Sequence, residues 1–186
     1  MIDRMSVLLT EADTPGLLAQ AREIFAEYGA SIADAAGCSL HHQHFDDELA
    51  SLPGKYAPPR GSIVLAYADA AGCGSGGVVS GAVEGRGTAS AAIGCIALRP
   101  LDNLGPEVCE LKRMYVRPAH RGTGLGRLLC QAVIDRARAA GYTVMKLDTD
   151  ATFAAAIGLY RSMGFVECER YNDDPMEDTL WFEKKL

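Results

Sequence analysis

Three glycines between two arginines form the most informative chemical pattern in this sequence. The glycines are Gly122, Gly124 and Gly126, and the arginines at the two ends of the segment are Arg121 and Arg127. Glycines lack the Cβ atoms that would keep a ligand away from backbone N–H donors, and arginines add charge-assisted hydrogen bonds to anions. Together they are typical of a loop that binds a diphosphate.

The segments on both sides indicate a strand before this loop and a helix after it. Val108 to Val116 favours a strand and ends before Pro118. After the loop, apolar residues recur at helical spacing up to Gly141, where we expect the helix to end. The face that we expect to be buried consists of Leu125, Leu128, Leu129, Ala132, Val133 and Ala137. The loop would then open a helix, whose unpaired N–H groups and dipole attract an anion.

The residues that the loop lacks indicate which kind of diphosphate it binds. A Walker loop would need a Gly-Lys-Ser/Thr sequence, which does not follow. A dinucleotide fingerprint counted from Gly122 would need glycine where Arg127 stands, although Asp148 lies about where a ribose-binding acid is expected. The loop therefore favours the pyrophosphate of coenzyme A, and a dinucleotide remains the alternative.

Three motifs in a consistent order resemble the GNAT superfamily of N-acetyltransferases. Arg121 to Gly126 is similar to its acetyl-CoA loop, R/Q-x-x-G-x-G/A. Glu110 to Val116 resembles its central strand, and Ala156 to Phe165 resembles its second signature, a helix ending in Leu-Tyr-x-x-x-Gly-Phe. The resemblance spans Val108 to Phe165, and the first hundred residues match only in general layout.

The resemblance implies a fold, a cosubstrate and a reaction. The fold is one α/β (α+β) domain over residues 1–186, a mixed and mostly antiparallel sheet with a central splayed parallel strand pair and helices on both faces. The reaction moves an acetyl group from acetyl-CoA directly to a primary amine of a small molecule or peptide. The implied coenzyme-binding residues are Met114, Tyr115, Val116, Arg121, Gly122, Thr123, Gly124, Leu125, Gly126 and Arg127.

Two catalytic residues are implied, and each has a plainer alternative. Tyr160 matches the tyrosine whose hydroxyl protonates the departing CoA thiolate, although its helix face is also that of a core tyrosine. Glu110 matches the strand position that supplies a general base in some members, so we expect it to deprotonate the amine or bind its ammonium group. Strand alternation puts Glu110 on one face with Lys112, Met114 and Val116, and an ion pair with Lys112 is the alternative.

The pantetheine arm of the coenzyme is expected to pair with backbone groups of residues 114–116, where the Val116 N–H would polarise the thioester carbonyl. One position departs from the family pattern, because Phe153 stands where many members have an asparagine that holds this arm. The polar residues 148–150 are candidates to replace that contact or to cap the following helix.

Other residues carry less specific signals. Tyr56 and Tyr171 are candidates for lining the acceptor pocket, and ordinary packing explains each of them equally well. His41, His42 and His44 lack a partnered cysteine or acidic cluster at zinc-site spacing, so we expect no metal there.

Composition narrows the partners. A net charge of −6 argues against a nucleic-acid binder and favours a small or cationic acceptor. The six cysteines form no Cys-x-x-Cys pair, and no apolar run is long enough for a membrane span, so we expect a reduced, cytoplasmic protein without membrane partners. Homodimers are common in the superfamily, although no feature of this sequence requires one.

Two other function classes remain open. A non-catalytic acyl-CoA sensor would use the same loop, and a nucleotide-dependent oxidoreductase would use it for a dinucleotide.

We expect the remaining elements as follows: strands at Ser6–Thr10, Ser62–Ala68, Ala91–Leu98, Thr143–Leu147, Phe165–Glu169 and Thr179–Glu183, helices from Pro15 to near Gly29, over Phe45–Leu52 and over Thr152–Met163, and a mobile loop at Gly72–Gly87.

Overall fold

A seven-stranded sheet organises the described part of the chain, which in this computed structural model comprises residues 6–36, 44–68, 91–174, 176 and 178–186. The predicted loop at Gly72–Gly87 and the histidines at 41 and 42 lie outside these residues. The strands are β1 Val7–Glu11, β2 Ser62–Ala68, β3 Gly94–Pro100, β4 Val108–Val116, β5 Val144–Asp150, β6 Val166–Glu167 and β7 Thr179–Lys185. The helices are α1 Pro15–Ala36, α2 Phe45–Ala50, α3 Leu125–Ala139 and α4 Ala154–Ser162, with short 3-10 turns η2 at Gly54–Tyr56 and η3 at Pro118–His120.

The sheet is antiparallel except at its centre. Its order is β1-β2-β3-β4-β5-β7-β6, and only β4 and β5 run parallel to each other. These two strands pair only where Val108–Glu110 meets Val144–Lys146, after which β4 stays with β3 and β5 stays with β7. The strands therefore separate beyond Glu110, which confirms the predicted fold and its splayed parallel pair.

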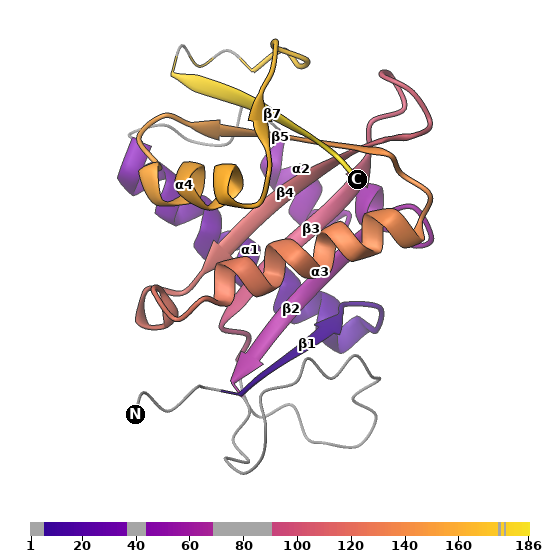
Figure 1. The fold of residues 1–186 in the computed structure, drawn as a ribbon. Coiled ribbons are helices and arrows are strands. Elements are labelled where there is room, and N and C mark those ends of the chain that lie inside the picture. The colour runs from indigo at the N-terminus through magenta and orange to yellow at the C-terminus, as the bar shows by residue number, and fades with distance from the viewer. Residues whose placement is uncertain (1–5, 37–43, 69–90, 175, 177) are drawn as a thin grey trace.

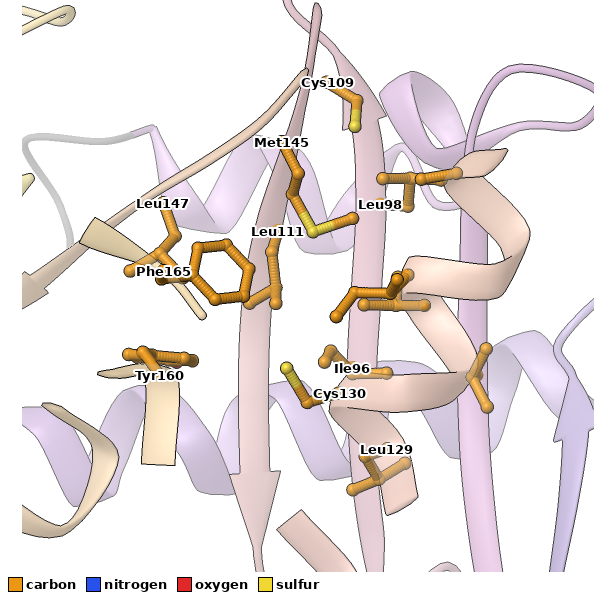
Figure 2. Close-up of a cluster of buried hydrophobic side chains, with 14 of the residues drawn as sticks. Ile96, Leu98, Cys109, Leu111, Leu129, Cys130, Met145, Leu147, Tyr160 and Phe165 are labelled. Carbon is orange, nitrogen blue, oxygen red and sulfur yellow. The ribbon is translucent and has the colours of Figure 1, made fainter. Parts of the chain in front are cut away.

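The helices cover the two faces of the sheet. Figure 1 shows α3 and α4 on one face and α1 and α2 on the other. On the α3 face, Leu111 and Met145 pack with Leu129 in a cluster that also contains Tyr160 and Phe165 (Figure 2). None of the helices in the described ranges has the length and apolar character needed to cross a membrane.

Helix α1 is longer than predicted. The sequence placed its end near Gly29, but the helix continues to Ala36. A Cβ atom at Gly29 would lie 2.5 Å from the Phe45 ring, so this glycine allows α1 to approach α2 closely and does not stop the helix.

The buried face of α3 also differs from the prediction in part. Leu125, Leu129 and Val133 are buried as expected, whereas Leu128 is 37% exposed. Cys130 and Ile134 are buried in addition, because the sheet contacts a wider stripe than the predicted residues cover.

Strand β4 contains a bulge that the alternation argument missed. Its partner pairs are Cys95 with Tyr115 and Ala97 with Lys112, so two residues of β4, Arg113 and Met114, face one residue of β3. Arg113 has a φ of 57°, in the left-handed region.

The bulge corrects the predicted faces of this strand. Lys112 lies directly opposite Ala97, which belongs to the core cluster on the α1 side, whereas Met114 and Val116 pack against the cluster on the α3 side. The four residues predicted to share a face are therefore divided between the two faces.

The Gly-Phe end of the second signature has a structural explanation. The Gly164 N–H donates to the Arg161 carbonyl and the Phe165 N–H donates to the Tyr160 carbonyl, both at 3.0 Å, which is the hydrogen-bond pattern of a Schellman helix end. The Phe165 ring then packs edge-on against Tyr160, with centroids 5.8 Å apart. The motif fixes where the helix ends and where its tyrosine lies.

Candidate active site

A cleft of about 630 Å³ opens where β4 and β5 separate. Its lining includes most of the predicted coenzyme-binding residues, namely Met114, Tyr115, Val116, Arg121, Gly122, Gly124, Leu125, Gly126 and Arg127. Tyr160, Phe153 and residues 148–150 also line it, and α1 contributes Tyr28, Ser31 and Ile32. Segments far apart in the chain therefore meet at one opening in the sheet.

The glycine loop leaves room for an anion at the N-terminus of α3. Gly122 and Gly124 have φ values of 76° and 89°, which side chains disfavour, and a Cβ atom added at either would meet nothing within 4 Å. The open space beside these backbones adjoins the first turn of α3, where helix N–H groups point outward. A diphosphate fits this environment.

The arginines at the two ends of the loop are held by nearby groups. The Arg121 Nε donates to the Val116 carbonyl at 3.0 Å, and the Arg127 Nη2 donates to the Ser162 hydroxyl at 2.6 Å. Thr123 does not line the cleft, because its hydroxyl donates to the His120 carbonyl at 2.8 Å and closes the turn.

The end of β4 directs backbone groups into the opening. The Arg117 N–H donates to the Ile93 carbonyl of the neighbouring chain segment at 3.0 Å. Because alternate residues of an antiparallel strand point to opposite sides, the N–H of Val116 faces away from β3, toward the gap between β4 and β5.

Tyr160 lies beside this backbone. Its side chain is 5% exposed, and its hydroxyl donates to the Met114 sulfur over 3.9 Å, a weak hydrogen bond. Burial raises the pKa of Tyr160 well above its ordinary value, so the phenol is protonated at neutral pH. Figure 2 shows the ring next to Phe165 and on the α3 side of the sheet.

Glu110 lies below the cleft and is not part of its lining. The side chain is fully buried and forms an ion pair with Arg99, while Lys112 is 3.7 Å away. The Tyr171 hydroxyl donates to the second carboxylate oxygen at 2.8 Å. The alternative ion pair with Lys112 is thus present, and Tyr171 contacts Glu110 and not the cleft.

Asp148 is the carboxylate of this buried network that lines the cleft. It accepts hydrogen bonds from Lys112 at 2.7 Å and from the Asn172 amide at 3.2 Å. Burial alone would raise the pKa of Asp148, but the charge and hydrogen bond of Lys112 hold it below its ordinary value. The sequence indicated Asp148 only as a candidate for ribose binding, pantetheine binding or helix capping.

Asp150 holds the turn before α4. Its carboxylate accepts a hydrogen bond from the Thr152 backbone N–H at 2.7 Å, as the sequence allowed for residues 148–150. Phe153 follows at the N-terminus of α4 and lines the cleft with its neighbours.

Tyr56 does not reach the cleft. It is 1% exposed, and its hydroxyl donates to Glu48 Oε1 at 2.9 Å. Glu48 in turn binds Arg113, which does line the cleft and which sequence reasoning missed. No local pattern marks Glu48 and Arg113 as partners, because 65 residues separate them.

Metal ligands and cysteines give no second site among the described residues. No group of three His, Cys, Asp or Glu side chains within those ranges is placed to hold a metal ion. Cys95, Cys109, Cys130 and Cys168 are free thiols.

Comparisons with known proteins identify the family. Residues 41–165 match the model of the acetyltransferase (GNAT) family. An uncharacterised N-acetyltransferase of Schizosaccharomyces pombe is 36% identical over 150 residues, which cover 81% of this chain and 79% of that protein.

Two further relatives differ in what they share with the chain. An L-methionine sulfoximine/L-methionine sulfone acetyltransferase of Pseudomonas aeruginosa is 52% identical over 52 residues, or 28% of this chain and 30% of that one. A putative acetyltransferase of Salmonella typhimurium, solved with acetyl-CoA, has the same fold with a TM-score of 0.64 at 21% identity, covering 97% of this chain and 94% of that one. The chain therefore belongs to the acetyltransferase (GNAT) family and is an acetyl-CoA-dependent N-acetyltransferase.

Proposed function

We propose that this enzyme transfers the acetyl group directly to a primary amine of a small molecule. The observation that carries the proposal is the meeting of three features in one cleft: the open glycine loop, the Val116 N–H and the Tyr160 hydroxyl. Direct transfer needs only a held thioester, a neutral amine and a proton donor for the thiolate.

The coenzyme wall would use mainly backbone groups. Acetyl-CoA supplies the acetyl group as a thioester. The loop around Gly122 and Gly124 would bind its pyrophosphate, and the backbone of residues 114–116 would bind the pantetheine arm. The Val116 N–H, which faces the gap, would donate to the thioester carbonyl as negative charge develops there.

Tyr160 would donate its hydroxyl proton to the sulfur of the leaving CoA thiolate. The hydroxyl has a weak sulfur acceptor at 3.9 Å, so a thiolate formed in the cleft would compete easily for its proton. The burial that raises the pKa of Tyr160 would also raise the pKa of a thiol bound beside it, so the pKa values of the two groups would stay matched.

The amine would approach from the α1 side of the sheet. On that side Asp148 lines the cleft, whereas Glu110 lies behind Lys112. We propose that Asp148 contacts the acceptor ammonium group, and that Glu110 acts through Lys112 and Tyr171 by fixing the charges at this wall. A neutral amine is needed for attack, and a nearby carboxylate favours binding of its ammonium form before the proton is lost.

A small acceptor agrees with the relatives. The Pseudomonas relative acts on L-methionine sulfoximine and L-methionine sulfone, and another relative, from Azospirillum brasilense, is an IAA acetyltransferase. The acceptor wall is formed by Tyr28, Ser31 and Ile32 of α1 and by Asp174 and Met176 near the chain's last strand.

The test is a screen for acetyl-CoA-dependent thiol release with a panel of primary amines, amino acids including methionine sulfoximine, and short cationic peptides. We expect small amines to be the best acceptors. Binding of acetyl-CoA without thioester consumption across the whole panel would contradict transfer and support an acyl-CoA sensor.

A further inference from the structure

The bulge in β4 lies directly before the backbone that we propose binds the thioester. It consists of Arg113 and Met114 opposite Ile96, and Arg113 is in the left-handed region where glycine is the residue usually found. A bulky side chain at such a position needs surroundings that hold it there. The contacts of the Arg113 side chain supply them.

The Arg113 guanidinium is fixed by an ion pair from α2. Its Nε donates to Glu48 Oε1 at 2.7 Å and its Nη2 donates to Glu48 Oε2 at 3.1 Å, which is the bidentate geometry that arginine forms with a carboxylate. Arg113 is 3% exposed and Glu48 is 8% exposed. The pair brings two opposite charges together in an interior where an isolated charge would be strongly destabilising.

Aromatic rings hold the guanidinium from two other directions. The Arg113 Cζ lies 4.8 Å from the centre of the Phe45 ring of α2 and 5.8 Å from that of the Tyr28 ring of α1. Tyr56 fixes the far side of the pair, since its hydroxyl donates to Glu48 Oε1 at 2.9 Å.

The bulge decides which backbone groups face the gap. Without the extra residue, residues 114–116 would move by one position relative to β3, and the N–H of Val116 would turn from the gap toward β3. We infer that Arg113 and Glu48 are a positioning pair, through which α1 and α2 hold the β4 bulge and thereby set the backbone donors for the pantetheine arm and thioester. This inference rests on the proposed function of residues 114–116.

The experiment compares two ligands by calorimetry: acetyl-CoA, and 3′-phosphoadenosine 5′-diphosphate, which lacks the pantetheine arm. The variants are Arg113→Ala, Arg113→Gly and Glu48→Gln, with Glu27→Gln as the matched control. Glu27 forms a similar bidentate pair with Arg117, at 2.9 and 2.6 Å, but away from the bulge. All measurements are made at a temperature where circular dichroism shows every variant to be folded.

We expect Arg113→Ala to weaken acetyl-CoA binding and to lower kcat by about tenfold each, while binding of the fragment is unchanged. Arg113→Gly should recover most of both losses, because glycine adopts the φ of 57° without a side chain to hold it. Glu48→Gln should give a smaller loss in the same direction, and Glu27→Gln should behave like the wild type.

Four outcomes would overturn the inference. Equal losses in Arg113→Gly and Arg113→Ala would show that the guanidinium itself is needed. A rise only in the acceptor KM would make Arg113 an acceptor-binding residue, and equal weakening of both ligands would indicate general loosening of the fold. If the wild-type protein bound acetyl-CoA no more tightly than it binds the fragment, the pantetheine arm would add no affinity. That result would contradict the proposed function of residues 114–116, and the inference with it.

Discussion

The two walls of the cleft are built in different ways. The proposed coenzyme wall consists of a loop, a strand end and two helix ends that follow one another between β4 and α4, and in our proposal it acts mainly through backbone groups. The acceptor wall combines α1, β4, β5 and the segment before β7, and it presents side chains joined in long-range pairs such as Arg113–Glu48 and Lys112–Asp148. The first wall suits a ligand common to a family, and the second suits a ligand that varies between its members.

The difference predicts different consequences of substitution. Changes in the coenzyme wall should alter acetyl-CoA binding or the chemical step for every acceptor. Changes in the acceptor wall should alter the acceptor KM, except at the Arg113–Glu48 pair, where we expect an effect on stability and, through the β4 bulge, on acetyl-CoA binding. The predictions below run from the largest expected effect to the smallest.

Tyr160→Phe removes the hydroxyl that we propose as proton donor. We expect kcat to fall about 10³-fold, because general acid catalysis typically contributes this much. The dissociation constant for acetyl-CoA should stay within about twofold of wild type, since phenylalanine keeps the packing against Phe165. Steady-state kinetics and calorimetry measure the two effects, and unchanged turnover would remove Tyr160 from the mechanism.

Glu48→Gln removes the buried carboxylate that pairs with Arg113. We expect the free energy of unfolding at pH 7 to fall by about 3 kcal/mol, as for other broken buried pairs. Burial alone would raise the pKa of Glu48, but the hydrogen bond and charge of Arg113 hold it below its ordinary value.

The pH dependence of that loss follows from the lowered pKa. The contribution of the ionised carboxylate is fully present above the unfolded pKa of about 4 and disappears as the pH falls through the lower folded pKa. Urea unfolding at pH 7 and at pH 3 should therefore show a difference between wild type and variant that shrinks in acid. An equal difference at both pH values would contradict the ion-pair explanation.

Gly124→Val places a side chain in the open space beside the loop. We expect the dissociation constant for acetyl-CoA to rise about thirtyfold, the loss of roughly one charge-assisted hydrogen bond of ~2 kcal/mol. The matched control is Gly141→Val, because Gly141 has a similar φ of 86° and also has nothing within 4 Å of an added Cβ, but follows the C-terminal end of α3. Equal weakening of acetyl-CoA binding in both variants would show that backbone strain, and not a side chain in the diphosphate site, causes the loss.

Asp148→Asn and Glu110→Gln compare the two carboxylates of the acceptor side. We expect Asp148→Asn to raise the acceptor KM about tenfold, because asparagine keeps a hydrogen-bond acceptor and loses only the charge, and Glu110→Gln to have a smaller effect. Both should leave the acetyl-CoA dissociation constant unchanged. If Glu110→Gln instead lowered kcat and left the acceptor KM unchanged, Glu110 would be the general base despite its burial.

The coenzyme wall could be read from the sequence because its signals are local. The glycines around Arg121 and Arg127, the helix spacing that follows and the Gly164-Phe165 helix end each act within a few residues. The β-favouring residue types also placed the strand before the loop correctly. Alternation failed for the faces of this strand, since the residue type of Arg113 gives no sign of a bulge.

The sequence by itself determined the loop, the helix N-terminus and the tyrosine that share this cleft, because backbone geometry and helix capping depend on neighbouring residues. Only the tertiary structure decided that Glu110 is buried behind Lys112, that Phe45 packs against Gly29, and that Glu48 forms an ion pair with Arg113. These are pairings between residues distant in the chain, and their stability comes from burial and charge neutralisation that exist only after folding.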